Sequence, residues 1–284
     1  MEDRIICPRS SLVGTSPYLL YSRDMYLENV GLCLSVLSLS SIFVVEALPE
    51  SVSFGEWKLV RTMTLNGPTN HVQGIEFDAD SLWVTSVDST NRRGYLREFS
   101  LTSGNLTKEI EVQQGERFHP GGIAADAESL WFPVAEYRPN SASIIQRRNK
   151  RTLGLELSFN VPDHIGCIAV TPEYLVGGNW DSRDFYVWDR TGKLVRKAAA
   201  NSGNAYQDMK FEGGLLVASG LFPDRTGAVD WMEFPSFHLM KRLKFGSTER
   251  HTPLTREGMA IRGKQLLLLA EDEPSRLFVF SLDR

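Results

Sequence analysis

Three of the five histidines stand at one position of a repeated segment. His71, His119 and His164 open the stretches HVQGIEF, HPGGIAA and HIGCIAV. Imidazoles at equivalent positions that converge, with Glu257 or Gln207 completing the shell, can hold a divalent metal of the zinc, manganese or iron type. The repetition also fits histidines that hold their own turns, and neutral rings that form hydrogen bonds in a ligand pocket. The sequence leaves these three roles open.

The same segments carry further polar residues close to the histidine position. Gln73 lies in the first copy, and two later copies read AYQDMKF and TREGMAI. We expect Gln73, Gln207, Asp208 and Arg256 to bind a ligand. Glu257 is a candidate catalytic acid or base, because a carboxyl group held in a pocket can exchange protons with a substrate.

A second set of charged residues follows the second apolar run of each copy. An acid with an arginine a few residues later occurs as Asp88 with Arg92 and Arg93, Glu136 with Arg138, Asp181 with Arg183, Asp224 with Arg225, and Asp272 with Arg276. Such a pair can tie its own turn, or the arginines can form a ring that attracts an anion. Glu136 and Asp272, as well as Asp88 and Glu271, can serve as catalytic acids or bases if they lie near the ligand.

Trp180 ends the second apolar run of the third copy, between Asn179 and Asp181. A tryptophan in this position can offer a stacking surface to a sugar or peptide, or it can cover its own turn. We include it among the candidate ligand-binding residues.

The elements that carry these residues are short strands. Residues 71–112 contain the runs GIEF, LWVTSV, YLREFSL and LTKEIEV, separated by turn residues, which predicts a four-stranded antiparallel meander. The copies begin at 71, 119, 164, 205 and 255. A four-stranded repeat of roughly 40 to 50 residues is typical of a propeller blade. The sequence therefore predicts an all-β, five-bladed propeller over residues 57–284.

The last copy ends after its third strand, at Leu282. The missing fourth strand would leave an unpaired sheet edge. Residues 57–65, WKLVRTMTL, alternate well enough to form a strand. We expect this segment to pair beside residues 276–282 and to close the ring with strands from both ends of the chain.

The first strand of every blade lines the central channel of a propeller, and the second strand runs back beside it. The start of the first strand and the end of the second therefore share one face. This arrangement predicts that the histidines and the acid–arginine loops surround one channel mouth, which would bind a small polar or anionic ligand such as a sugar, peptide or organic acid.

The N-terminal region does not fit the repeat. Residues 30–45 carry no charge, which is short for a membrane span of about 20 residues and suits the core of a secretion signal. We expect residues 1–47 to be a signal peptide, with Met25 as an alternative start, and residues 48–56 to be a linker. This predicts a secreted or periplasmic protein, or one anchored to a membrane by the uncleaved segment.

Composition excludes one class of partner. The formal charge is −4, so no basic excess favours nucleic acid, and 42% hydrophobic side chains suffice for a large core. We expect a monomer without a stable membrane span.

Two segments resemble a known family. QGIEFDADSLWVTSV followed by GYLREFSLTSGNLTKEIEV is similar to the first blade of bacterial and plant glutamine cyclotransferases, which are five-bladed propellers. EGMAIRGKQLLLLAEDEPSRLFVFSL resembles their blade entries, in which Glu-Gly is followed by two apolar residues. The resemblance covers residues 57–284, and more broadly the pattern is similar to gluconolactonase and NHL-type propellers. It implies a ligand or metal at the channel mouth.

The blade starts depart from the cyclotransferase pattern. That family carries acids or tryptophans where this chain has His71, His119 and His164, and only Glu257 retains the acid. The sequence looks closest to an uncharacterised secreted propeller family. Two functions follow: an enzyme, which would be a metal-assisted hydrolase, lyase or cyclotransferase, or a non-catalytic scaffold that binds a protein or glycan.

Overall fold

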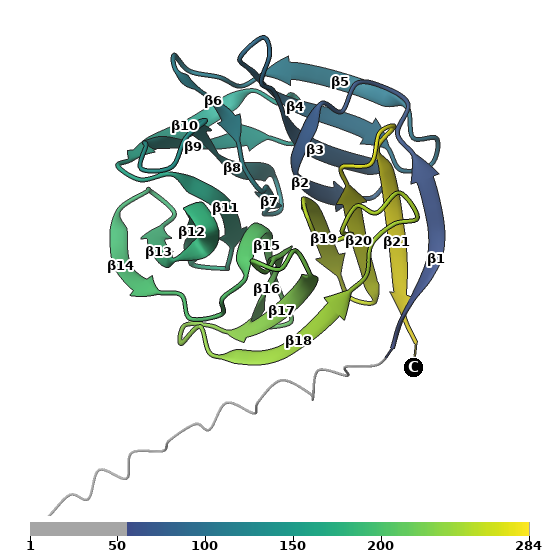
Figure 1. Cartoon of the computed structure of the whole chain (residues 1–284). Helices are drawn as coiled ribbons and strands as arrows, with labels where there is room; N and C mark the ends of the chain where they lie inside the picture. Colours follow the sequence, from purple (N-terminus) through teal and green to yellow (C-terminus); the bar gives the residue numbers. More distant parts are fainter. Residues whose placement is uncertain (1–55, 284) are drawn as a thin grey trace, which may run out of the picture. The chain divides into compact units, whose positions relative to one another are not determined.

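A computed structural model describes residues 56–283, which form five antiparallel sheets arranged in a ring (Figure 1). The predicted all-β, five-bladed propeller is confirmed. The predicted signal peptide and all but the last residue of the predicted linker lie outside the described residues. Within the described part, no helix is long and apolar enough to cross a membrane.

Each blade is a meander that runs outward from the channel. Blade one contains β2 (His71–Asp78), β3 (Ser81–Asp88), β4 (Arg93–Ser100) and β5 (Leu106–Glu111). Blade two contains β6 (Arg117–Pro120), β7 (Ala124–Ala125), β8 (Ser129–Glu136), β9 (Ser143–Asn149) and β10 (Leu155–Val161). Blade three contains β11 (Ile165–Val170), β12 (Tyr174–Asn179), β13 (Asp184–Asp189) and β14 (Leu194–Ala199), with the short helix η1 (Trp180–Ser182) after β12. Blade four contains β15 (Ala205–Glu212), β16 (Leu215–Leu221), β17 (Gly227–Glu233) and β18 (Leu239–Phe245).

Blade five is built from both ends of the chain. It contains β19 (Gly258–Arg262), β20 (Gln265–Ala270) and β21 (Arg276–Leu282), and its outer strand is β1 (Trp57–Thr64). The strands β1 and β21 pair antiparallel from Trp57 opposite Leu282 to Thr64 opposite Arg276, at the outer edge of the ring (Figure 1). The predicted closure is confirmed, and it gives the edge of β21 a hydrogen-bonding partner.

The core lies between neighbouring blades. Five apolar clusters are formed, one for each pair of adjacent blades. Trp83 packs in the cluster between blades one and two, and Trp131 packs in the next cluster, between blades two and three. Burial of both faces of each sheet therefore holds the ring together.

β-bulges shape the first strands where they line the channel. The register with the second strand shifts at Gln73 in β2, at Gly166 in β11 and at Gln207 in β15. A bulge inserts one unpaired residue and redirects its side chain. All three bulged residues lie at the same repeat position, which Glu257 occupies just before β19.

Blade two departs from the uninterrupted first strand that the repeat predicted. Its strand breaks between β6 and β7 at Gly121 and Gly122. A Cβ on Gly121 would lie 2.1 Å from the carbonyl oxygen of Gly166, and one on Gly122 would lie 2.6 Å from that of Gln207. The amide of Gly122 donates a hydrogen bond to Gly166 O at 2.8 Å. Contact between blades at the axis therefore requires glycine and replaces pairing within the blade.

Asp208 joins three blades at the axis. Its fully buried carboxylate accepts hydrogen bonds through Oδ2 from the amides of Ile75 in blade one, at 2.8 Å, and Met259 in blade five, at 3.1 Å. Its Oδ1 accepts from the amide of Met209 at 3.0 Å and from Lys210 Nζ at 2.6 Å. Burial raises the pKa of this carboxyl to about 6, while Lys210 and the two amides of the other blades act in the opposite direction.

We predict that Asp208→Asn destabilises the propeller by about 3 kcal/mol, because it removes the ion-pair partner of the buried ammonium of Lys210. Urea unfolding followed by tryptophan fluorescence measures the change. Asp224→Asn is the matched control, since Asp224 is exposed and its side chain accepts bonds from Thr226 in its own turn. Equal stability of the two variants would contradict this role for Asp208.

Candidate functional site

A pocket of about 260 Å³ lies at the channel mouth, and all five blades contribute to its wall. Its wall includes eight residues that the sequence predicted, namely His71, Gln73, His119, His164, Trp180, Gln207, Arg256 and Glu257. The other lining residues are Tyr137, Gly166, Asn179, Asp181, Tyr206 and Leu221. Two positions of the repeat thus meet at one mouth, as the sequence predicted. The first position provides the histidines, and the third provides the bulged residues and Glu257.

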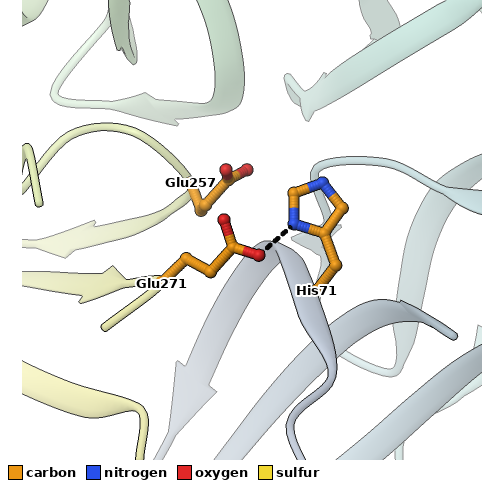
Figure 2. Close-up of side chains that lie close together, drawn as sticks. All are labelled: His71, Glu257 and Glu271. Atoms are coloured by element: carbon orange, nitrogen blue, oxygen red, sulfur yellow. Dashed lines mark hydrogen bonds and ion pairs between the residues drawn. The ribbon is translucent and has the colours of Figure 1, made fainter. Parts of the chain in front are cut away.

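Two carboxyl groups of blade five face His71 of blade one (Figure 2). His71 Nδ1 lies 2.7 Å from Glu271 Oε1. Single ligand atoms of His71, Glu257 and Glu271 all lie within 4.8 Å of one another. Glu271 directly follows β20, while Glu257 directly precedes β19, so the pairing of these strands brings the two carboxyl groups together.

Arg256 connects the two glutamates. Its Nε donates to Glu257 Oε1 at 3.0 Å, and its Nη2 lies 3.1 Å from Glu271 Oε2. Glu257 is almost completely buried, whereas Glu271 and Arg256 are partly exposed. The cluster is therefore shielded from solvent at Glu257 and accessible to solvent at Glu271.

The two carboxyl groups differ in acidity. Burial raises the pKa of Glu257 to about 8, and the charge of Glu271 adds to this rise against the opposing effects of His71 and Arg256. Burial also acts to raise the pKa of Glu271, but the hydrogen bond and charge of His71 and the charge of Arg256 outweigh it and leave that pKa lowered. At neutral pH Glu257 is a neutral acid beside an ionised Glu271.

His71 has the opposite balance from the other two histidines of the pocket. Burial acts to lower its pKa, but the hydrogen bond to Glu271 and the charges of both glutamates raise it overall. Burial lowers the pKa of His119 well below its ordinary value, and the charges of His164 and His71 add to this effect. Burial likewise lowers the pKa of His164. Only His71 among the three is therefore held toward its charged form.

A row of rings forms the opposite wall of the pocket. Tyr137 stacks on His119 with centroids 4.4 Å apart, and His119 lies 5.3 Å from His164. The row ends at Trp180, whose ring meets His164 edge-on at 4.6 Å. The wall thus combines flat apolar faces with ring nitrogens.

The hydrogen bonds of these rings set their chemistry. His164 Nδ1 lies 2.9 Å from the carbonyl oxygen of Arg138, which can only accept, so Nδ1 carries the proton and the lone pair of the neutral ring lies on Nε2. The Nδ1 atom of His119 is buried and has no hydrogen-bond partner within the described structure. This covered nitrogen has no partner that would stabilise a second proton, which agrees with a neutral ring.

A backbone feature positions Trp180 and Asp181. Asp181 and Ser182 have φ values of 59° and 50°, a region that non-glycine residues rarely adopt. The Oγ of Ser182 accepts a hydrogen bond from the amide of Tyr206 at 3.0 Å, and Asn179 Oδ1 accepts one from the amide of Asp184 at 2.8 Å. Contacts on both sides therefore hold this turn against the pocket.

The structure groups the predicted metal ligands differently from the sequence. Among residues 56–283, the group of three potential ligands consists of His71, Glu257 and Glu271, and it excludes His119 and His164. One imidazole and two carboxylates suit zinc, manganese or iron. Arg256 contacts both groups, so it already balances part of the charge of Glu271 and would do the same for Glu257 once that group loses its proton.

Three predicted residues lie outside the pocket. Asp208 lies beneath it, where its oxygens hold the blades. Glu136 pairs with Arg138 at 2.8 Å, and buried Asp272 pairs with Arg276 at 3.0 Å, so these two acids tie their own turns. In two of the other loops the acid binds a neighbour other than arginine, since Asp88 accepts from Asn91 and Asp224 accepts from Thr226.

Tyr137 is a pocket residue that the sequence did not indicate. It directly follows Glu136 at the end of β8. Its position as the aromatic neighbour of the acid in that loop is the signal that could have identified it. Glu271 was one of several acids at equivalent loop positions, and no periodic signal separates it from Asp272.

Comparison with known proteins supports the fold. A family of unknown function (DUF6454) matches residues 85–210, which is less than half of the chain. No curated protein matches the sequence.

Among solved structures, a glutaminyl cyclase from Myxococcus xanthus superposes with a TM-score of 0.59 at 14% identity, and the match covers 80% of this chain and 97% of that one. BamB from Moraxella catarrhalis gives a TM-score of 0.41 at 12% identity, and the match covers 77% of this chain and 60% of that one. Hydrazine synthase from Kuenenia stuttgartiensis gives a TM-score of 0.44 at 15% identity, and the match covers 72% of this chain and 56% of that one. The first confirms the resemblance to glutamine cyclotransferases in the fold.

We predict that Glu257→Gln changes the pH dependence of stability. The raised pKa of Glu257 means that its contribution to stability is fully present below the ordinary value of 4.5 and is lost as pH rises through about 8. The glutamine stays neutral, so the stability of the variant relative to the wild type should rise between pH 5 and pH 9 by at least about 1.4 kcal/mol, the value of one pKa unit. Urea titrations across this range test it.

Glu173→Gln, which alters an exposed turn residue outside the pocket, is the control and should show no such trend. A flat difference between Glu257→Gln and the wild type across the range would contradict the protonated state assigned to Glu257.

Proposed function

We propose that the channel mouth is the active site of an enzyme that transfers protons to and from a small polar substrate. The carrying observation is that two neighbouring carboxyl groups, Glu257 in the pocket wall and Glu271 beside it, have environments that push their pKa values apart. The group with the raised pKa is then the acid, and the ionised group supports the base.

Glu257 acts as the general acid. Its O–H donates a proton to the oxygen or nitrogen of the substrate that becomes more negative during the reaction, and Arg256 at 3.0 Å stabilises the carboxylate that remains. The base is the neutral form of His71, and its raised pKa makes it a stronger proton acceptor. In this form the carboxylate of Glu271 fixes the proton on Nδ1 and leaves the lone pair on Nε2. The proton that His71 removes from the substrate balances the one that Glu257 donates.

The remaining pocket residues bind the substrate. Gln73 and Gln207 project from their bulges, and amides can both donate and accept hydrogen bonds. The neutral rings of His119 and His164 offer acceptor nitrogens, and Trp180 offers an aromatic surface. These groups suit a small molecule with several polar groups.

Three reaction classes use this proton exchange: cyclising transfer, hydrolysis and elimination. The first has the support of the structural neighbour, which is a glutaminyl cyclase. The predicted signal peptide in residues 1–47 supports a site of action outside the cytoplasm, and we include that location in the proposal.

We predict that the wild type converts at least one of three probes, one for each class: a peptide with N-terminal glutamine, an aldonolactone, or an oligouronate. Glu257→Gln should lower kcat/KM by at least about 100-fold, the usual contribution of a general acid. The wild-type rate should fall above pH 8 as Glu257 loses its proton, and should fall again at low pH as His71 becomes charged.

Glu173→Gln should retain the full rate. An enzyme whose Glu257→Gln variant keeps its rate and pH profile would overturn the proposed acid. Lack of conversion of all three probes, together with tight binding of a glycan or protein, would instead favour the non-catalytic scaffold.

A second candidate function is metal-assisted catalysis, favoured by the grouping of His71, Glu257 and Glu271 within 4.8 Å. A divalent cation there would polarise a substrate oxygen. Isothermal titration with zinc or manganese chloride tests it. We expect one ion per chain, with binding weakened at least about tenfold in His71→Ala, as ligand loss commonly causes. His238→Ala is the control, and equal binding by both variants would exclude this site.

A further inference from the structure

A second pocket of about 550 Å³ adjoins the channel mouth on the side of blades one and two. We call it the outer groove. Arg92 comes from the turn between β3 and β4, Glu116 and Phe118 precede or lie in β6, and Glu136 and Arg138 flank Tyr137 after β8. The function proposed above makes no use of this groove.

Tyr137 is common to both pockets. It lines the channel mouth and the outer groove, and its side chain is 42% exposed. Its ring stacks on that of His119 in the channel mouth, with centroids 4.4 Å apart. The same ring meets that of Phe118 in the outer groove edge-on, with centroids 6.0 Å apart. A ligand that passes from one pocket to the other therefore crosses an aromatic surface without leaving the protein.

Two arginines stand along the groove. Arg92 pairs with Glu116, and the two side chains are 58% and 76% exposed. An exposed ion pair of this kind contributes little stability, because water solvates both partners, so a carboxylate on a ligand can replace Glu116 at little cost. Arg138 is 64% exposed, while its partner Glu136 is only 24% exposed and stays in place. The exposed side of each planar guanidinium group can bind a ligand carboxylate through paired hydrogen bonds.

We propose that the ligand is elongated, with a polar head in the channel mouth, a middle part across Tyr137, and a carboxylate in the outer groove bound by Arg92 and Arg138. The position of the head rests on the proposed function. Acidic peptides and uronate oligosaccharides both carry carboxylates on an elongated polar chain, and the groove recognises the group that they share.

Isothermal titration with two acidic probes tests the proposal, and their neutral counterparts serve as references. The probes are tetra-aspartate and tetragalacturonate, compared with tetra-asparagine and tetragalactose. We expect one acidic probe to bind at least about tenfold more tightly than its neutral counterpart, as hydrogen bonds to charged groups provide. The probe that binds identifies the source of the carboxylate.

The double variant Arg92→Gln with Arg138→Gln should remove this preference. Arg151→Gln with Lys193→Gln removes the same charge from exposed positions outside both pockets and should preserve it. Tyr137→Phe should retain binding and Tyr137→Ala should weaken it. Glu257→Gln should still bind the probe, which separates the groove from catalysis. Equal binding of acidic and neutral probes, or an unchanged preference in the arginine double variant, would overturn the proposal.

Discussion

A single buried carboxylate holds together the strand segments that carry the pocket. Asp208 accepts hydrogen bonds from the amides of Ile75 and Met259, each two residues beyond a pocket residue, Gln73 and Glu257. Its own preceding residue, Gln207, lines the pocket as well. Three side chains from three blades are therefore placed relative to one another by one group that lies below them, and a shift at the axis would move all three.

The electrostatics of the pocket follow from unequal burial. Glu257 is held away from water where ionisation is costly, while Glu271 keeps access to solvent and the imidazole of His71. Arg256 contacts both carboxyl groups and offsets part of the repulsion between their charges when a proton leaves Glu257. The neutral rings of His119 and His164 complete the wall without adding charge.

The sequence predicted the fold and the location of the pocket well, because both depend on repetition. Apolar runs at a regular period located the blades, and the missing last strand indicated the role of residues 57–65. Repeat position alone could not distinguish Gln207, which enters the pocket, from Asp208, which lies beneath it, since a one-residue bulge separates their directions. It could not identify Tyr137 or choose Glu271 over Asp272, because loop residues follow no period.

Closure of the ring has a consequence for the order in which the molecule is made. The strand β1 is synthesised before every blade, yet its partner β21 is synthesised last. Blades one to four can form from neighbouring segments as they emerge, but blade five must join distant segments at a higher entropic cost. The strand β1 therefore has no partner until β21 has been synthesised, and a chain that stops before Arg276 leaves the ring open.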